Sequence, residues 1–168
     1  MKPHHSIALG ALLLAACAGE PVAPPAAPAA PQPVSGWSFR LHRAGCPLAC
    51  PDYEIAIAPD GMVDYNGHER VARTGRLRTN ADPIRLYELQ QQLGRSRFFE
   101  LAQDYRQGTP DCGLWTPDQP IATLEVSDGA RSVRIVHDLG CASAPAQLRE
   151  IENQIDRATG SARFVRGQ

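Results

Sequence analysis

Four cysteines between residues 46 and 141 constrain the fold of this chain more than any other feature. Cys46 and Cys50 lie four positions apart, just before a strand-like run, and Cys112 and Cys141 follow much later in the chain. The first spacing suits three chemistries: a structural disulfide, a redox dithiol or a metal site. The compartment decides between them, because thiols stay reduced in the cytosol and are oxidised outside it.

The start of the chain predicts export. Lys2 precedes an apolar stretch from Ile7 to Ala16, which is too short to span a bilayer as a helix and is typical of a secretory signal. The stretch ends in LAAC, residues 14–17, which resembles the bacterial lipobox, where a peptidase cuts before the cysteine and the cysteine is acylated. We expect residues 1–16 to be a lipoprotein signal peptide and Cys17 to carry the lipid anchor, including palmitate. An ordinary signal peptide that happens to end near a cysteine is the alternative.

The residue after Cys17 bears on location. In lipoproteins an aspartate at this position tends to retain the protein at the inner membrane, and here the residue is Ala18. The resemblance to a lipobox therefore implies a lipid-anchored protein of the cell envelope, at the outer membrane of a diderm bacterium and facing the periplasm. Two or three acyl chains hold a protein to a membrane far more firmly than one.

A linker and a single domain are expected to follow the anchor. Residues 17–36 are rich in proline and alanine and almost uncharged, which predicts a semi-rigid extended spacer. Residues 37–168 are long enough for one domain with its own core. Without Lys2, the only lysine, sixteen arginines face eighteen acidic residues. This nearly neutral balance argues against a nucleic-acid partner.

Two hairpins are predicted in the domain. Residues 37–43 alternate apolar and polar positions, as a first strand with one buried face does. Pro59, Asp60 and Gly61 suit a type I turn with a glycine bulge, which sets Ile57 opposite Val63 and Ile55 opposite Tyr65. Residues 69–79 are expected to form one or two exposed strands. In the second hairpin, Asp128-Gly129 predicts a two-residue turn, with Ser127 opposite Ala130 and Leu124 opposite Val133.

Two amphipathic helices complete the expected domain. The first begins after the N-cap Asp82 and ends near Gly94, and the second runs from about Pro145 to Ala158. Residues 162–167 are expected to close the chain with a short strand. Antiparallel hairpins covered on one face by two helices predict an α+β fold.

Several segments together resemble a known family. They are GCPLACPDYEIAIAPDGMVDYNG, the pair FF, DCGLWTPDQP, RSVRIVHDLGC and LREIENQIDRATGSARFV. They are similar to a bacterial family of secreted and lipid-anchored proteins known as domain of unknown function 6438, from about Arg43 to Val165. The signature Cys46, Cys50, Pro51 and Tyr53 carries most of the resemblance. The family has no established activity, so the resemblance implies a fold and a location but no chemistry.

A thiol site at Cys46 and Cys50 is the main alternative to a disulfide. The pair is similar in spacing to that of envelope copper-delivery proteins, and His42 or His137 would supply the further ligand. Those proteins place the pair between a strand and a helix, whereas here a hairpin follows. A redox dithiol also needs a helix start or positive charge beside it, and only Arg43 is near. With Cys17 acylated, an even number of cysteines remains, so we predict two structural disulfides and no metal or other cofactor.

The disulfide pairing follows from the hairpin register. Extending the second hairpin sets Cys141 opposite Thr116, and Cys112 is close enough for the loop to bring the two cysteines together. Cys46 and Cys50 can close on each other if the chain turns between them. We predict the pairs Cys46–Cys50 and Cys112–Cys141.

The sequence offers few candidates for catalytic or binding residues. None of the histidines lies in a recognisable nucleophile motif, and Asp104, Asp111 and Asp118 sit in a long loop where acidic residues are usually solvated, so a non-catalytic role is favoured over an enzyme. Trp115 and Asp118 are candidate binding residues, although a tryptophan beside a disulfide commonly packs over it.

The sequence thus favours a membrane-anchored envelope lipoprotein that binds a protein, a glycan or a small ligand without catalysis. The alternative is a thiol-redox or copper-handling protein that uses Cys46 and Cys50.

Overall fold

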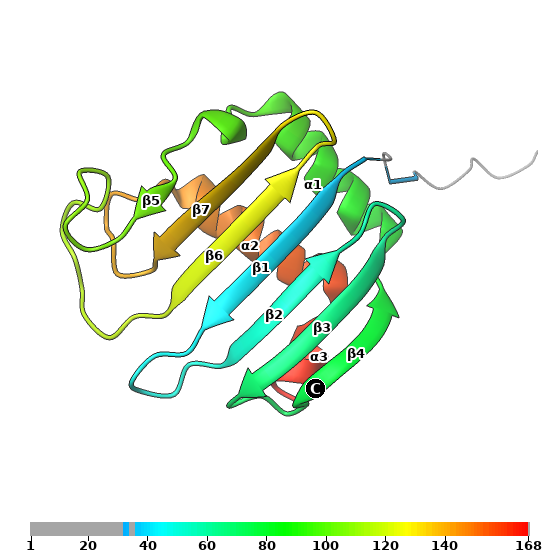
Figure 1. Cartoon of the computed structure of the whole chain (residues 1–168), viewed down its shortest axis with the longest axis horizontal. Coiled ribbons are helices and arrows are strands. Elements are labelled where there is room, and N and C mark those ends of the chain that lie inside the picture. Colours follow the sequence, from blue (N-terminus) through cyan, green and yellow to red (C-terminus); the bar gives the residue numbers. More distant parts are fainter. Residues whose placement is uncertain (1–31, 34–35, 168) are drawn as a thin grey trace, which may run out of the picture.

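A seven-stranded sheet forms the framework of the protein, with strand order β4-β3-β2-β1-β6-β7-β5 (Figure 1). The computed structural model describes residues 32–33 and 36–167, so the expected signal peptide, Cys17 and nearly all of the expected linker lie outside the described residues. The strands are β1 (Ser38–Ala44), β2 (Asp52–Ile57), β3 (Met62–Glu69), β4 (Gly75–Asn80), β5 (Asp104–Tyr105), β6 (Ile121–Ser127) and β7 (Ser132–Asp138).

Two long helices, α1 (Pro83–Arg95) and α2 (Ala146–Thr159), lie side by side on one face of the sheet (Figure 1). A short 3-10 helix (Phe98–Glu100) and the one-turn α3 (Ala162–Val165) complete the described elements. The predicted α+β fold, with two amphipathic helices on one face, is confirmed. None of the described helices is both long and apolar enough to cross a membrane.

Alternation along the strands divides the sheet into a core face and an open face. In β1 the side chains of Phe39 and Leu41 are buried against the helices, and Arg40 between them is exposed. The strands β2, β3, β6 and β7 follow the same period. One layer of helices covers only one face of the sheet, so the other face stays open and carries the polar side chains.

The helices form where the sequence predicts them. The Asp82 side chain accepts hydrogen bonds from the N–H groups of Ile84 and Arg85, and Pro83 occupies the first turn. In α2 the leucine and isoleucines of the predicted stripe, Leu148, Ile151 and Ile155, are fully buried. That helix ends at Gly160, whose φ of 63° is the left-handed conformation that favours glycine.

The first hairpin has the predicted register. Ile57 lies opposite Val63 and Ile55 opposite Tyr65. Gly61, with φ 82°, donates its N–H to the Ala58 carbonyl at 2.9 Å. The turn is therefore closed by the glycine bulge that the sequence predicts.

The register predicted for the second hairpin is wrong. Ser127 lies opposite Ser132, and Leu124 opposite Ile135 rather than Val133. The turn is centred on Gly129 and Ala130, because the Asp128 carboxylate accepts from the N–H groups of Ala130 and Arg131. The observed partner of each β6 residue lies two positions further along β7 than predicted, and a shift of two positions leaves the same side chains on the core face. Hydrophobic alternation therefore cannot distinguish the two registers.

The exposed strand predicted within residues 69–79 is confirmed as β4, which begins at Gly75. Two other parts of the chain differ from expectation. Residues 162–165 form the helical turn α3 instead of a closing strand. β5 was not predicted, and it pairs in parallel with β7 at one edge, which makes the sheet mixed. Two residues are too few to give a detectable period.

Candidate functional site

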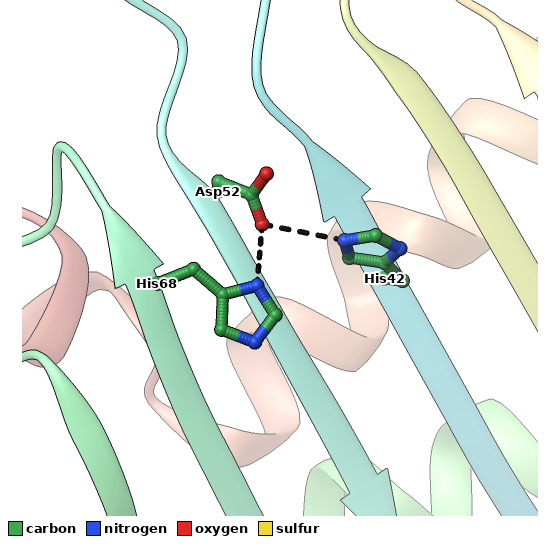
Figure 2. Close-up of side chains that lie close together, drawn as sticks. All are labelled: His42, Asp52 and His68. Atoms are coloured by element: carbon green, nitrogen blue, oxygen red, sulfur yellow. Dashed lines mark hydrogen bonds and ion pairs between the residues drawn. The ribbon is translucent and has the colours of Figure 1, made fainter.

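Three polar side chains meet on the open face of the sheet (Figure 2). Asp52 Oδ1 lies 3.3 Å from His42 Nε2 and 2.7 Å from His68 Nδ1. His42 comes from β1, Asp52 from the start of β2 and His68 from the end of β3, so three neighbouring strands each contribute one side chain. One donor atom from each residue lies within 4.8 Å of the others. We call His42, Asp52 and His68 the open-face cluster.

A β-bulge lies where His68 meets Asp52. Tyr53 pairs with Gly67, but Asp52 pairs with Glu69, so the register shifts between the two pairs and His68 is the extra residue. Bulges re-aim side chains in this way. Gly67, next to the bulge, lets the connection from β3 to β4 approach closely, because a Cβ there would lie 2.1 Å from the Arg73 carbonyl oxygen. Sequence reasoning missed this cluster.

Gly45, the residue before the Cys46–Cys50 loop, fixes the orientation of Asp52. The N–H of Gly45 donates to Asp52 Oδ2 at 3.1 Å, which leaves Oδ1 turned toward the histidines. Partial burial alone would raise the pKa of the Asp52 carboxyl, but the hydrogen bonds from Gly45, His68 and His42 outweigh burial and lower the pKa. Asp52 is therefore a carboxylate at neutral pH.

The Cys46–Cys50 disulfide closes the loop next to Gly45. The predicted pair is confirmed, with a Cα–Cα distance of 5.2 Å. Arg70 Nη1 also donates to the Cys46 carbonyl at 3.3 Å, which ties the loop to the chain after β3. Neither sulfur is a free thiolate in this state, so the alternative copper site at Cys46 and Cys50 would first require reduction.

A second polar group is buried between the sheet and α2. Glu152 is fully buried, and its Oε1 lies 2.6 Å from His137 Nδ1. Its Oε2 lies 3.4 Å from Arg43 Nη1. Arg43 also bonds to Asp156, at 2.8 Å from Nη2 and 2.9 Å from Nε. We call His137, Glu152, Arg43 and Asp156 the buried network.

Opposite charges stabilise the part of the buried network around Arg43 and Asp156. Desolvation alone would lower the pKa of the Arg43 guanidinium, but the Asp156 and Glu152 carboxylates outweigh it and raise the pKa. Burial, followed by the Asp156 carboxylate beside its hydroxyl, raises the pKa of Tyr53. Tyr53 therefore remains a neutral donor to Asp156, at 2.8 Å. These contacts join β1 and β2 to α2.

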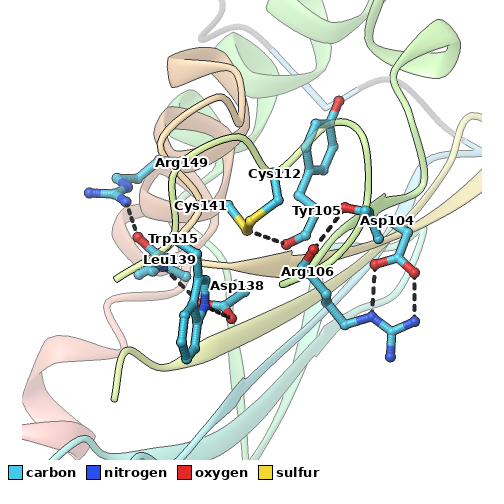
Figure 3. Close-up of a disulfide and its surroundings, with 11 residues drawn as sticks. Asp104, Tyr105, Arg106, Cys112, Trp115, Asp138, Leu139, Cys141 and Arg149 are labelled. Atoms are coloured by element: carbon cyan, nitrogen blue, oxygen red, sulfur yellow. Dashed lines mark hydrogen bonds and ion pairs between the residues drawn. A yellow bond between two sulfur atoms is a disulfide. The ribbon is translucent and has the colours of Figure 1, made fainter. Parts of the chain in front are cut away.

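The second disulfide, Cys112–Cys141, closes the long loop over the edge of the sheet (Figure 3). The predicted pair is confirmed, with a Cα–Cα distance of 4.5 Å. The extrapolated register was wrong, since Cys141 forms a bridge with Trp115 and not with Thr116. The pair still forms because the loop folds back through Ser143, whose N–H donates to the Cys112 carbonyl.

The predicted binding residues, Trp115 and Asp118, lie in this loop. Neither belongs to the open-face cluster or to the buried network. Trp115 is half-buried and donates from Nε1 to Asp138 Oδ2 at 2.7 Å (Figure 3). Asp138 is itself buried, so Trp115 satisfies a carboxylate that would otherwise lack a donor on that oxygen. Asp118 is exposed, with φ 61°. Binding by Trp115 or Asp118 remains a prediction.

The acidic residues considered for catalysis are also dispersed. Asp104 forms a two-point ion pair with Arg106, which lowers the pKa of the carboxyl through hydrogen bonds from the guanidinium (Figure 3). Asp111 is exposed. No hydrogen bond joins a histidine to a serine, threonine or cysteine side chain within residues 32–33 and 36–167.

Comparison with known proteins places the chain in a family. None of the curated proteins matches it. One family model, described as Domain of unknown function (DUF6438), matches residues 38–159. This range begins with β1 and ends with α2, so it contains the open-face cluster, the buried network and both disulfides. The chain therefore belongs to the DUF6438 family.

Proposed function

We propose that this protein is an envelope lipoprotein, anchored to a membrane through Cys17, whose domain is a non-catalytic binding module. The observation that carries the proposal is the state of the domain's cysteines. All four are paired in two disulfides, which fits folding in an oxidising compartment outside the inner membrane.

The lipobox-like LAAC and the proline-rich stretch that follows support the anchor. The first strand begins at Ser38, about twenty residues after Cys17. An extended proline-rich chain reaches about 3.1 Å per residue, so such a linker would hold the domain several nanometres from the membrane. An outer-membrane location facing the periplasm is part of the proposal, because Ala18 follows the cysteine.

A polar open face supports binding. α1 and α2 cover the other face of the sheet (Figure 1). The open face over β1 to β4 carries a shallow groove of about 510 Å³. Arginines and acidic side chains line it, including Arg40, Glu54, Asp64, Arg76 and Arg78. A groove of mixed charge is suited to a polar ligand such as a glycan or a peptide, which we propose as the class of partner.

Replacing Cys17 with alanine is expected to release the protein from the membrane. The wild type should partition into the detergent phase of a temperature-induced phase separation, and Cys17→Ala into the aqueous phase, since acyl chains contribute about 0.8 kcal/mol per buried methylene. A matched control is Cys46→Ala with Cys50→Ala, which removes two cysteines of the domain and should stay in the detergent phase. A wild type found in the aqueous phase would contradict the anchor.

A further inference from the structure

We propose that the open-face cluster is a binding site for a divalent transition-metal ion of the zinc or copper(II) class, held by His42 Nε2, Asp52 Oδ1 and His68 Nδ1. The proposal goes beyond the proposed function, because His42, Asp52 and His68 lie outside the groove proposed for a glycan or peptide and would bind a different class of ligand. It does not depend on the lipid anchor, so the two can fail separately.

The donor atoms have the arrangement that such an ion needs. Both histidine nitrogens face the same carboxylate oxygen, and all three donors lie within 4.8 Å of one another (Figure 2). Zinc binds histidine nitrogen and carboxylate oxygen at about 2.0–2.2 Å. An ion between the three atoms would replace the two contacts that now join the imidazoles to Asp52. Side-chain rotation alone can bring partly exposed residues to those distances.

Asp52 and His68 are also held by residues outside the cluster, as ligands of a metal site usually are. Asp52 is fixed through Oδ2 by the N–H of Gly45, so its other oxygen remains directed at the histidines. The second ring nitrogen of His68, Nε2, lies 2.8 Å from the side-chain amide of Asn66. Rotation of this amide can present either its N–H or its oxygen. Asn66 can therefore support the tautomer in which Nδ1 is free to bind a metal.

Chemistry favours zinc or copper(II) over magnesium or calcium. Two imidazoles suit zinc, copper, nickel and iron, whereas magnesium and calcium take oxygen ligands. Only three protein ligands converge in the described part of the chain, and the side chains of His42 and His68 are each 34% exposed. Solvent or a donor atom of a partner can therefore take the remaining coordination position.

The structure also supplies a functional use for the first disulfide. Gly45, which orients Asp52, directly precedes Cys46, where the closed loop begins. Opening the disulfide would loosen the loop and with it the carboxylate. We expect metal affinity to fall by about tenfold in the variant Cys46→Ala with Cys50→Ala, the effect typical of removing an outer-shell partner.

Calorimetric titration of untagged, detergent-purified protein with zinc chloride tests the proposal. We expect one equivalent to bind, and His42→Ala or His68→Ala each to lower the affinity by more than about tenfold. Asp52→Asn should do the same. Glu125→Gln is the matched control, because it neutralises an acidic side chain on the same open face, paired with Arg134 and outside the groove, and should bind zinc like the wild type.

A second measurement identifies the ligands even if a variant folds poorly. With copper(II), the electron paramagnetic resonance spectrum of the wild type should show coordination by two imidazole nitrogens, and the spectrum of His68→Ala should show at most one. Magnesium chloride should produce no binding heat. The proposal is overturned if the wild type binds neither zinc nor copper(II) stoichiometrically. It is equally overturned if one equivalent still binds with wild-type affinity when His42 and His68 are both replaced.

Discussion

Replacing Glu152 with alanine is expected to destabilise the fold by about 3 to 5 kcal/mol, the cost typical of breaking a buried ion pair. Glu152 is fully buried, and His137 is its neighbour at 2.6 Å. Nε2 of His137 has no hydrogen-bond partner in the described structure, so losing Glu152 would leave the whole imidazole without one. Arg43 would keep Asp156 but lose the deeper of its two carboxylates.

Glu150 provides the matched control on the same helix. It is an exposed glutamate whose partner is Arg157, and exposed pairs contribute about 0 to 1 kcal/mol. Urea denaturation of Glu152→Ala, Glu152→Gln and Glu150→Ala measures the difference. Glu152→Gln keeps the shape and a hydrogen bond to His137, so its loss should be smaller than that of Glu152→Ala. A Glu152→Ala protein within 1 kcal/mol of the Glu150→Ala protein would contradict a stabilising role for the buried network.

Removing the Cys112–Cys141 disulfide is expected to lower the free energy of unfolding by about 3.5 kcal/mol. The bond closes a segment with a sequence separation of 29, and in the chain-entropy model longer loops gain more from closure. Both cysteines are buried in the core cluster, where alanines would also leave small cavities. The double variant Cys112→Ala with Cys141→Ala avoids leaving a free thiol.

The shorter disulfide gives the comparison. Cys46–Cys50 has a separation of 4, for which the same model gives about 2 kcal/mol. Urea denaturation of the two double variants under non-reducing conditions should therefore place the Cys112–Cys141 variant below the Cys46–Cys50 variant in stability. The opposite order would mean that the long loop contributes little to the fold.

Local turn chemistry explains which parts of the fold could be predicted from the sequence. Pro59, Asp60 and Gly61 have only one good arrangement between two strands, and the first hairpin formed as predicted. Asp128-Gly129 is a weaker signal, because an aspartate can also cap the turn from outside it, as it does here. The alternation of β6 and β7 fits both registers, so nothing local corrects the error.

The open-face cluster was within partial reach of the sequence. Ile55 opposite Tyr65 was predicted, and continuing that register by three pairs sets Asp52 opposite His68. His42 lies on the polar side of the first predicted strand. The sequence does not show that β1 lies beside β2, which brings His42 to the other two side chains. Nor does it predict the bulge, through which Asp52 pairs with Glu69 and His68 becomes the extra residue.

The buried network could not be predicted in the same way. Arg43 occupies an inward position in the alternation of β1, but its partners Glu152 and Asp156 are more than a hundred residues away. On α2, Glu152 lies four residues after Leu148 and three before Ile155, on the apolar stripe, but the sequence does not show which charge it meets there. Only the packing of α2 against β1 shows that Arg43 and Glu152 share one buried site.

The mass of the intact protein, purified from membranes without reductant, tests the central claim most directly, namely that this is a lipid-anchored, disulfide-braced envelope protein. The account predicts a chain that begins at Cys17, carries acyl chains there and gains four hydrogens on reduction, two for each disulfide. A chain that retains residues 1–16, or that starts elsewhere without lipid, would contradict the anchor. A mass unchanged by reduction would contradict the oxidised domain.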